Sequence, residues 1–343
     1  MKPLKYLFIS SMLFVATSCG NSWLDLEPST SVDTETSIKI LSDVEFTLNG
    51  IYSTMQSSDA YSGRLVYYGD VTGDDMQAVS STKRVANYYR FNFTKDDNPS
   101  SHWSYLYSII QNCNLILMNI DKLVIDEGDK AYRDDLKGEA LAIRGLALFD
   151  LTRIFGYPYL KDKGASLGVP IIEGLSTIDS KPARNTVAQC YTKIIDDLTQ
   201  SISLLGEKFN KGKINKWGAM VLLSRVYLYK GENANALEMA EKAIAGAEKN
   251  KYALWTNEDY PTAWGEDASA SKPGEVLFEI VNLTTDSPGK ESMGYLNSYD
   301  GYDDMCITCS FYQFLKEDPK DIRLKLLSFD KKYYAYVNKY QPQ

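Results

Sequence analysis

Apolar residues recur at helical spacing through much of the chain. In the first such segment, residues 38–56, the apolar stripe consists of Val44, Leu48, Ile51, Tyr52 and Met55. The same period predicts further helices over 101–123, 134–155, 186–205, 215–230 and 235–249. The pattern therefore predicts a mainly α protein.

The segment 134–155 is apolar almost all round, which predicts a central buried helix that ends at Gly156. Arg144, Asp150 and Arg153 are charged positions on this helix. Charges on so apolar a helix need partners, and Asp150 and Arg153 are three residues apart. We expect a structural network and keep a binding role as the alternative.

The next helices carry signals of their own. Thr186 and Gln189 form a capping-box pattern at the start of 186–205. In the last two helices, tetratricopeptide-like spacing is found in a set of mostly small residues, namely Ser224, Tyr227, Ala236, Ala240 and Ala243. Such residues let paired helices approach closely. We expect tetratricopeptide-like helix pairs, an α-solenoid-like core.

Two regions lack a sustained period and are rich in Ser, Asp, Gly and Tyr. They are residues 57–100 and the chain from 256 onward, where only 275–281 has a strand-like pattern. Long loops in a folded domain often carry function. The expected organisation is a helical region over 37–255 and a loop-rich ligand face that includes 256–343.

The chain begins with a leader. Lysines at 2 and 5 precede an apolar run over 7–16, and Ala16, Thr17 and Ser18 then lead to Cys19. This is the layout of a secretory signal peptide with a loose bacterial lipobox. We predict a signal peptide over 1–18, a lipidated Cys19 and a polar tether over 19–36. Acyl chains such as palmitate would then hold the protein to a membrane. The alternative is an ordinary signal peptide with Cys19 incidental.

Net charge makes nucleic acid an unsuitable partner. The chain carries −8, and the two lysines of the leader are part of that sum. An acidic body lacks the basic face that a phosphate backbone requires.

Catalytic signatures are weak. His102 is the single histidine, which excludes His-based metal clusters, and an exposed or capping role is the expected one. There is no GxSxG, P-loop or GxGxxG motif. Cys306 and Cys309 form a CxxC without the context of a redox or zinc site, so a local disulfide and two free thiols both remain open.

Acidic pairs occur in the loops, at Asp74–Asp75 and Asp303–Asp304. A glycoside hydrolase needs two carboxyl groups held apart across a sugar, which sequence neighbours rarely provide. Structural calcium is a further option, although no EF-hand spacing is present.

Tyrosine is abundant, with 25 residues against 12 Phe. An exposed ring can stack on the apolar face of a sugar while polar neighbours bind its hydroxyls. The alternative is that the rings pack under their own loops. The candidate ligand-binding residues are Tyr61, Asp74, Asp75, Tyr88, Tyr89, Trp264, Tyr295, Tyr299 and Tyr302.

Several segments together resemble the SusD/RagB family of outer-membrane lipoproteins of Bacteroidetes. They are CGNSWLDLEPST from Cys19, GEALAIRGLALFDLTRIFGYPYL over 138–160, and then, in order, RNTVAQCYTKIIDDLTQSISLL, NKWGAMVLLSRVYLYKGENANALEMAEKAI, EVLFEI and FYQFLKEDPKDIRLKLL. The resemblance covers nearly all of the chain from Cys19 to Tyr340.

The resemblance implies a tetratricopeptide-like fold with a loop-rich face, and a surface lipoprotein on a SusC-like TonB-dependent transporter of the outer membrane. Members capture oligosaccharides, or peptides in some branches, and do not catalyse. Family members usually continue well past the KY stretch at Lys339 and Tyr340. We therefore expect either a short member or an incomplete C-terminal region. An extracytoplasmic glycoside hydrolase is the alternative from another class.

Overall fold

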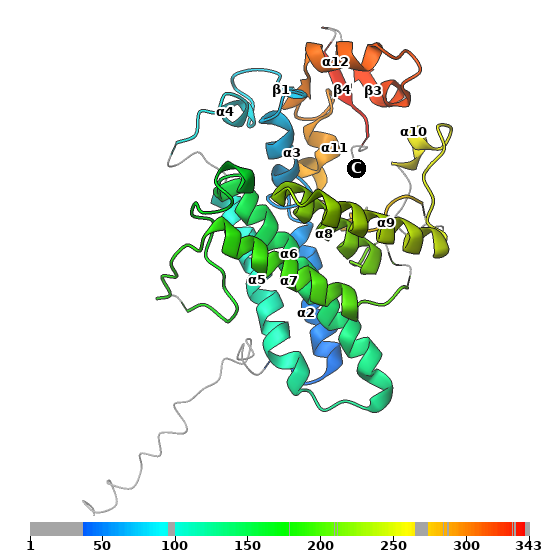
Figure 1. Cartoon of the computed structure of the whole chain (residues 1–343). Coiled ribbons are helices and arrows are strands. Elements are labelled where there is room, and N and C mark those ends of the chain that lie inside the picture. Colours follow the sequence, from blue (N-terminus) through cyan, green and yellow to red (C-terminus); the bar gives the residue numbers. More distant parts are fainter. Residues whose placement is uncertain are drawn as a thin grey trace, which may run out of the picture. The chain divides into compact units, whose positions relative to one another are not determined.

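Long helices that follow one another in sequence also pack on one another in space (Figure 1). Among the residues that the structure describes, the long helices are α2 (Leu41–Met55), α5 (Ser100–Asn119), α6 (Lys130–Phe155), α7 (Val187–Leu204), α8 (Lys216–Lys230) and α9 (Asn233–Lys249). Each packs against the next, from α2 and α5 to α8 and α9. This arrangement confirms the predicted solenoid of helix pairs.

The computed structural model describes residues 37–94, 100–177, 179–208, 210, 212–264, 274–283, 285–286, 288–330, 332 and 334–339. The predicted signal peptide, Cys19 and the tether lie outside these residues. Residues 40–343 form one compact unit, and the statements below concern that unit. No helix in the described part of the chain is long and apolar enough to cross a membrane.

Helix α6 is the predicted central helix, buried on nearly every face from Leu136 to Thr152. Arg144 donates two hydrogen bonds to Asp197 of α7, at 2.7 and 2.8 Å, and one to Asn114 of α5 at 2.9 Å. These bonds join three consecutive helices. Asp150 and Arg153 form the predicted ion pair. Both findings confirm the structural reading of these charges.

The pair α8–α9 shows why small residues recur there. The Ser224 hydroxyl donates a hydrogen bond to the carbonyl of Ala236 at 2.7 Å. A Cβ on Gly246 would lie 2.0 Å from the ring of Trp217, so only glycine fits against this indole. The chain reverses at Gly231, whose φ of 84° favours glycine.

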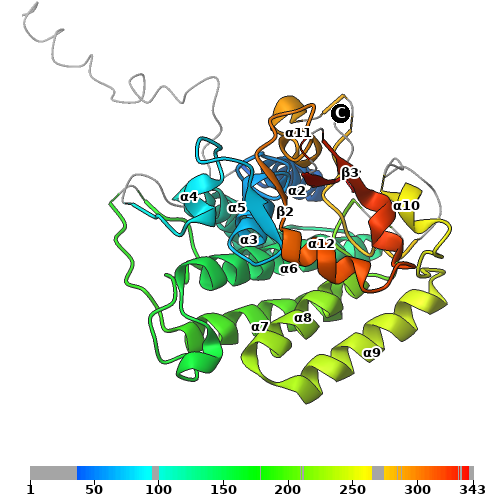
Figure 2. The same ribbon diagram turned by 90° about the horizontal axis from the view of Figure 1, so that it is seen from above.

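Short elements from two distant parts of the chain form a second layer, drawn above the long helices in Figure 1. The first part supplies α3 (Arg64–Val71), β1 (Met76–Ala78) and α4 (Ala86–Tyr89). The second supplies α11 (Met293–Leu296), β2 (Met305–Ile307), α12 (Cys309–Lys316), β3 (Leu327–Phe329) and β4 (Ala335–Val337). Between them in sequence lies α10 (Tyr260–Ala263). Figure 2 shows the same elements from above.

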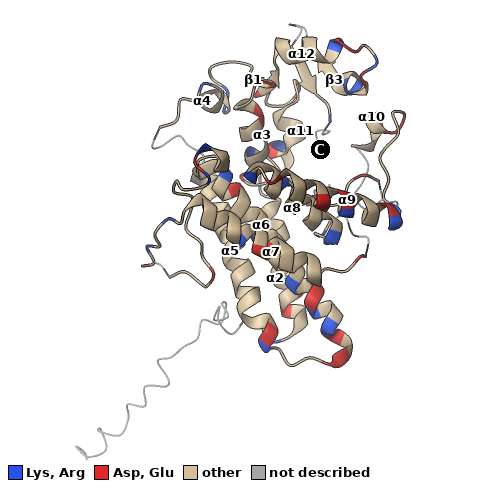
Figure 3. Ribbon diagram, viewed as in Figure 1, with Lys and Arg blue, Asp and Glu red and all other residues tan. Residues whose placement is uncertain are grey.

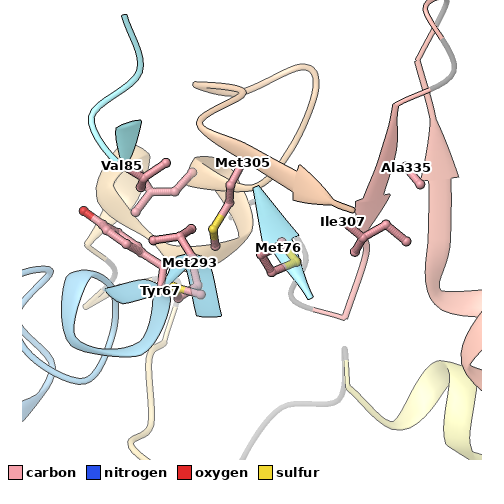
Figure 4. Close-up of a cluster of buried hydrophobic side chains, with 9 residues drawn as sticks. Tyr67, Met76, Val85, Met293, Met305, Ile307 and Ala335 are labelled. Carbon is pink, nitrogen blue, oxygen red and sulfur yellow. The ribbon is translucent and has the colours of Figure 1, made fainter. Parts of the chain in front are cut away.

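Two antiparallel strand pairs hold this layer together. In β1–β2, Met76 faces Ile307, and in β3–β4, Leu327 faces Val337. Side chains of these strands join an apolar cluster from both parts of the chain, drawn in Figure 4: Tyr67, Val71, Met76, Val85, Met293, Leu296, Met305, Ile307 and Ala335. The composition of residues 57–100 predicted one long loop. The structure shows instead that this region contains short helices and a strand. These short elements are stabilised by partners more than 200 residues away in sequence.

The predicted strand over 275–281 is wrong, because this segment forms no strand pair among the described residues. Two of its backbone carbonyls are bound by side chains at the ends of helices instead. Asn215 donates to the carbonyl of Leu277 at 2.6 Å, and Gln56 donates to that of Val281.

His102 lies inside the fold, only 1% exposed, so the exposed or capping role expected for it is wrong. Its Nδ1 bonds the carbonyl of Asp59 at 3.1 Å, and burial lowers the pKa of the ring.

Cys306 and Cys309 are free thiols. Figure 3 shows Lys and Arg mixed with Asp and Glu on α9 and at the start of α6.

Candidate ligand-binding site

The segment 292–304 forms a tight loop that presents three tyrosines. Ser292 caps α11 by accepting a hydrogen bond from the amide of Tyr295. The amide of Tyr302 then returns to the carbonyl of Tyr295 at 3.0 Å. A Cβ on Gly301 would lie 1.9 Å from that same carbonyl oxygen, so the turn requires glycine. The backbone thus sets the positions of the rings.

Tyr295, Tyr299 and Tyr302, here called the tyrosine face, are three of the predicted ligand residues. The rings of Tyr295 and Tyr302 meet edge to face, with centroids 5.2 Å apart. Tyr299 is 46% exposed and Tyr302 is 38% exposed. Two of the three rings are therefore accessible, on a backbone that the loop contacts fix, and their role as ligand-binding residues stays a prediction.

Two basic residues from the chain's first part hold the tyrosine face in place. The Arg84 guanidinium lies 4.0 Å from the centroid of the Tyr302 ring, a cation–π contact. It also pairs with Glu291 and Asp304, each at 3.0 Å. Lys83 donates to the carbonyl of Tyr302 at 2.6 Å.

The charges below the tyrosine face are largely compensated. Lys83 pairs with Asp303 at 3.4 Å, and the Tyr336 hydroxyl donates to the same carboxylate at 2.5 Å. Burial raises the pKa of Asp304 although Arg84 acts against this shift. Burial, followed by the bond to Asp303, raises the pKa of the Tyr336 hydroxyl. A face with balanced charge suits a neutral polar ligand better than a strongly charged one.

Tyr88 and Tyr89 belong to a second aromatic group on α4. Tyr88 contacts Tyr68, with ring centroids 5.3 Å apart, and also Phe93 at 5.9 Å. Tyr89 is 37% exposed. Nearby Phe91 is 64% exposed and has a φ of 54°, an uncommon conformation for a bulky residue. The structure therefore adds Phe91 and Phe93 to the candidate ligand-binding residues of this region.

Trp264 lies at the end of α10 and not with the tyrosine face. Its ring contacts Trp255, with centroids 5.0 Å apart, and Tyr260 at 5.5 Å. The Lys339 ammonium lies 3.7 Å from the Trp264 ring centroid. These four residues form a third group, here called the Trp264 cluster.

The remaining candidates are placed differently. The Tyr61 hydroxyl points inward and donates to Asp150 at 2.8 Å, so it is engaged in the helical body. Asp74 and Asp75 are exposed, and their backbone carbonyls accept hydrogen bonds from Thr308 at 2.8 and 2.9 Å. Within the described residues, no group of three or more His, Cys, Asp or Glu side chains is placed to hold a metal.

Sequence reasoning missed the basic residues of the site. Lys83 and Arg84 are adjacent and lie five and four residues before Tyr88, and this closeness of basic and aromatic residues was the available signal. Two hollows in the described part of the chain are lined by other residues than the nine candidates. One, of about 230 Å³, is lined by Tyr52, Gln56 and Lys213 among others, and another, of about 420 Å³, lies within the segment 171–182.

A stack of helix pairs with exposed aromatic rings is typical of helical-repeat proteins that bind a ligand or partner on their surface. Comparison with known proteins specifies the family. Residues 22–228 match the SusD-like family, described as starch-binding and associating with the outer membrane. The chain belongs to this SusD/RagB family, which confirms the resemblance seen in its sequence.

Its relatives show the same fold. A proposed sugar-binding protein of Bacteroides vulgatus is 83% identical with a TM-score of 0.88, over 90% of this chain and 69% of that one. A SusD superfamily protein of the same species is 38% identical with a TM-score of 0.82, over 88% and 69%. SusD-like protein P2 of Formosa agariphila is 28% identical over 88% of this chain. The chain spans 57% of that relative's length.

Proposed function

We propose that this protein captures oligosaccharides at the cell surface and delivers them to a SusC-like TonB-dependent transporter in the outer membrane. The single observation that carries the proposal is the tyrosine face on a SusD-like fold. The family description as starch-binding, and that of the Bacteroides vulgatus relative as a proposed sugar-binding protein, support a glycan as the ligand.

Capture would use the chemistry of the tyrosine face. The apolar side of a pyranose ring stacks on Tyr299 or Tyr302, which are both partly exposed. Tyrosine hydroxyls and the nearby carboxylates can then bind sugar hydroxyls. Because Arg84 and Lys83 fix the loop beforehand, little conformational entropy is lost on binding.

Anchoring would follow from Cys19. A lipidated cysteine followed by the tether over 19–36 would hold the body at the outer membrane. The helix pairs would form the part that faces the transporter. Mass spectrometry of the membrane fraction tests this step, and a mature chain that begins anywhere other than an acylated Cys19 contradicts it.

Capture predicts binding without turnover, which separates this function from that of a glycoside hydrolase. We would titrate the protein from residue 37 onward with α- and β-glucan oligosaccharides by calorimetry and assay the same samples for new reducing ends. Saturable binding with no new ends is expected. New reducing ends would indicate a hydrolase. Binding of peptides with no binding of any glycan would indicate a peptide-capturing member of the family.

A further inference from the structure

The Trp264 cluster holds a cation of the protein's own. The Lys339 ammonium lies 3.7 Å from the Trp264 ring centroid, within the range in which a cation is attracted to the negative face of an indole. The position of this ammonium marks a place where the fold already accepts a positive charge.

Neighbouring rings support the Trp264 indole. Trp255 lies at 5.0 Å with an interplanar angle of 79°, and Tyr260 lies at 5.5 Å with an angle of 86°. The two supporting rings also contact each other, with centroids 6.2 Å apart. Trp255 is itself fixed, because a Cβ on Gly274 would lie 2.5 Å from its Nε1. Three rings in mutual contact give an aromatic wall that cannot easily rearrange.

Carboxylates add a second reason for a cation at this place. Glu275 accepts a hydrogen bond from the amide of Trp255 at 3.1 Å, and both Glu275 and Asp70 attract the Lys339 ammonium. A ligand ammonium that reaches the same face of the Trp264 ring would compete with the Lys339 ammonium for this cation–π contact.

We propose that the Trp264 cluster is a binding site for the ammonium group of an amino sugar, and that Lys339 occupies this site until such a ligand displaces it. The sugar ring would stack on the aromatic wall while its ammonium takes the position of the lysine Nζ. This site rests on the proposed glycan capture and adds to it a preference for oligosaccharides with free amino groups.

Three hexasaccharides with one β-1,4 backbone test the inference. They differ only at C2, where cellohexaose carries a hydroxyl, the chitin hexamer an acetamide and the chitosan hexamer an amine, which is an ammonium in titrations run in mildly acidic buffer. Calorimetric titration should give a dissociation constant about tenfold lower for the chitosan hexamer than for the other two. Equal binding of the three overturns the ammonium site and leaves the glycan function standing, whereas absence of binding by these and by all glucans contradicts the proposed function itself.

Variants separate this site from general attraction of a polycation to an acidic protein. Trp264→Ala should abolish the preference for the chitosan hexamer, and Trp264→Phe should retain part of it. Lys339→Ala should increase the affinity for the chitosan hexamer about threefold or more, because no internal cation competes. Tyr157→Ala is the matched control, because it removes another exposed ring with a lysine ammonium over it, and it should leave the preference intact. A preference that survives Trp264→Ala, or a lysine-rich peptide that binds as tightly as the chitosan hexamer, overturns the proposal.

Discussion

Arg84 and Asp304 form an ion pair at 3.0 Å although they stand 220 positions apart in the sequence. The same guanidinium covers the Tyr302 ring. One arginine therefore links the first part of the second layer, which supplies α3, β1 and α4, to the loop that carries the tyrosine face. Ligand affinity should then depend on Arg84, although this residue has no aromatic ring.

Replacing Arg84 by Ala should weaken both the fold and the binding. Asp304 is 3% exposed and would lose its charged partner, which costs about 1–3 kcal/mol of unfolding free energy. Glycan affinity should fall about threefold to tenfold, because Tyr302 loses its support. Urea unfolding and calorimetry measure the two effects. Arg323→Ala is the control, since the Arg323 side chain is 50% exposed in its pair with Asp321 and its loss should change neither quantity measurably.

The buried pair of Arg144 and Asp197 should matter for stability alone. Asp197→Ala leaves a buried guanidinium without its bidentate partner and should lower the unfolding free energy by about 3–5 kcal/mol. The double variant R144M/D197L should cost less than the single one, because no charge stays buried without a partner. Urea unfolding decides, and a double variant at least as unstable as the single variant contradicts this account.

Glu139 should make stability fall as pH rises. Burial raises the pKa of this carboxyl from an ordinary value of 4.5 to about 7, although the Tyr52 hydroxyl donates to it at 2.7 Å. Between these two values the folded state keeps a proton that the unfolded state has lost. Stability from this group is therefore greatest below pH 4.5 and declines as pH rises towards 7.

Glu139→Gln keeps an oxygen for Tyr52 and removes the titration. Wild type should lose on the order of 3 kcal/mol relative to this variant between low pH and a pH above 7. Urea unfolding of both proteins across this range measures the difference, and groups common to both cancel. Parallel pH profiles for the two proteins would show that Glu139 ionises normally in the folded state.

Tyr61→Phe should destabilise the fold and leave ligand binding unchanged. The variant removes one of the hydrogen bonds to the buried Asp150 carboxylate and should cost about 1–2 kcal/mol. Thermal unfolding measures this loss. A clear loss of glycan affinity in a folded Tyr61→Phe protein would return Tyr61 to the ligand-binding residues predicted from sequence.

The helices could be predicted because their signal is local. The stripe of Val44, Leu48, Ile51 and Met55 is buried as its spacing predicted, and Thr186 caps α7 with Gln189 as the motif indicated. In both cases neighbouring positions contain the information. The family resemblance was likewise confirmed by the match over residues 22–228.

The second layer of short elements could not be predicted, because its contacts join segments that are far apart in the sequence. Nothing near Met76 indicates that it pairs with Ile307, and nothing near Arg84 indicates Tyr302. The segment 275–281 misled for a related reason, since helix side chains and not strands bind its carbonyls. The sequence identified candidate aromatic residues, but only the fold shows that they lie in three separate groups: the tyrosine face, the group on α4 and the Trp264 cluster.

The most direct test of the central claim compares two tyrosine variants in one titration. The double variant Y299A/Y302A removes exposed rings of the tyrosine face, whereas Tyr157→Ala removes a ring that is 57% exposed beyond the end of α6. With the tightest-binding neutral glucan oligosaccharide, the double variant should lose about tenfold or more in affinity and Tyr157→Ala should bind like wild type. Unchanged binding by a folded Y299A/Y302A protein would contradict the assignment of glycan capture to the tyrosine face.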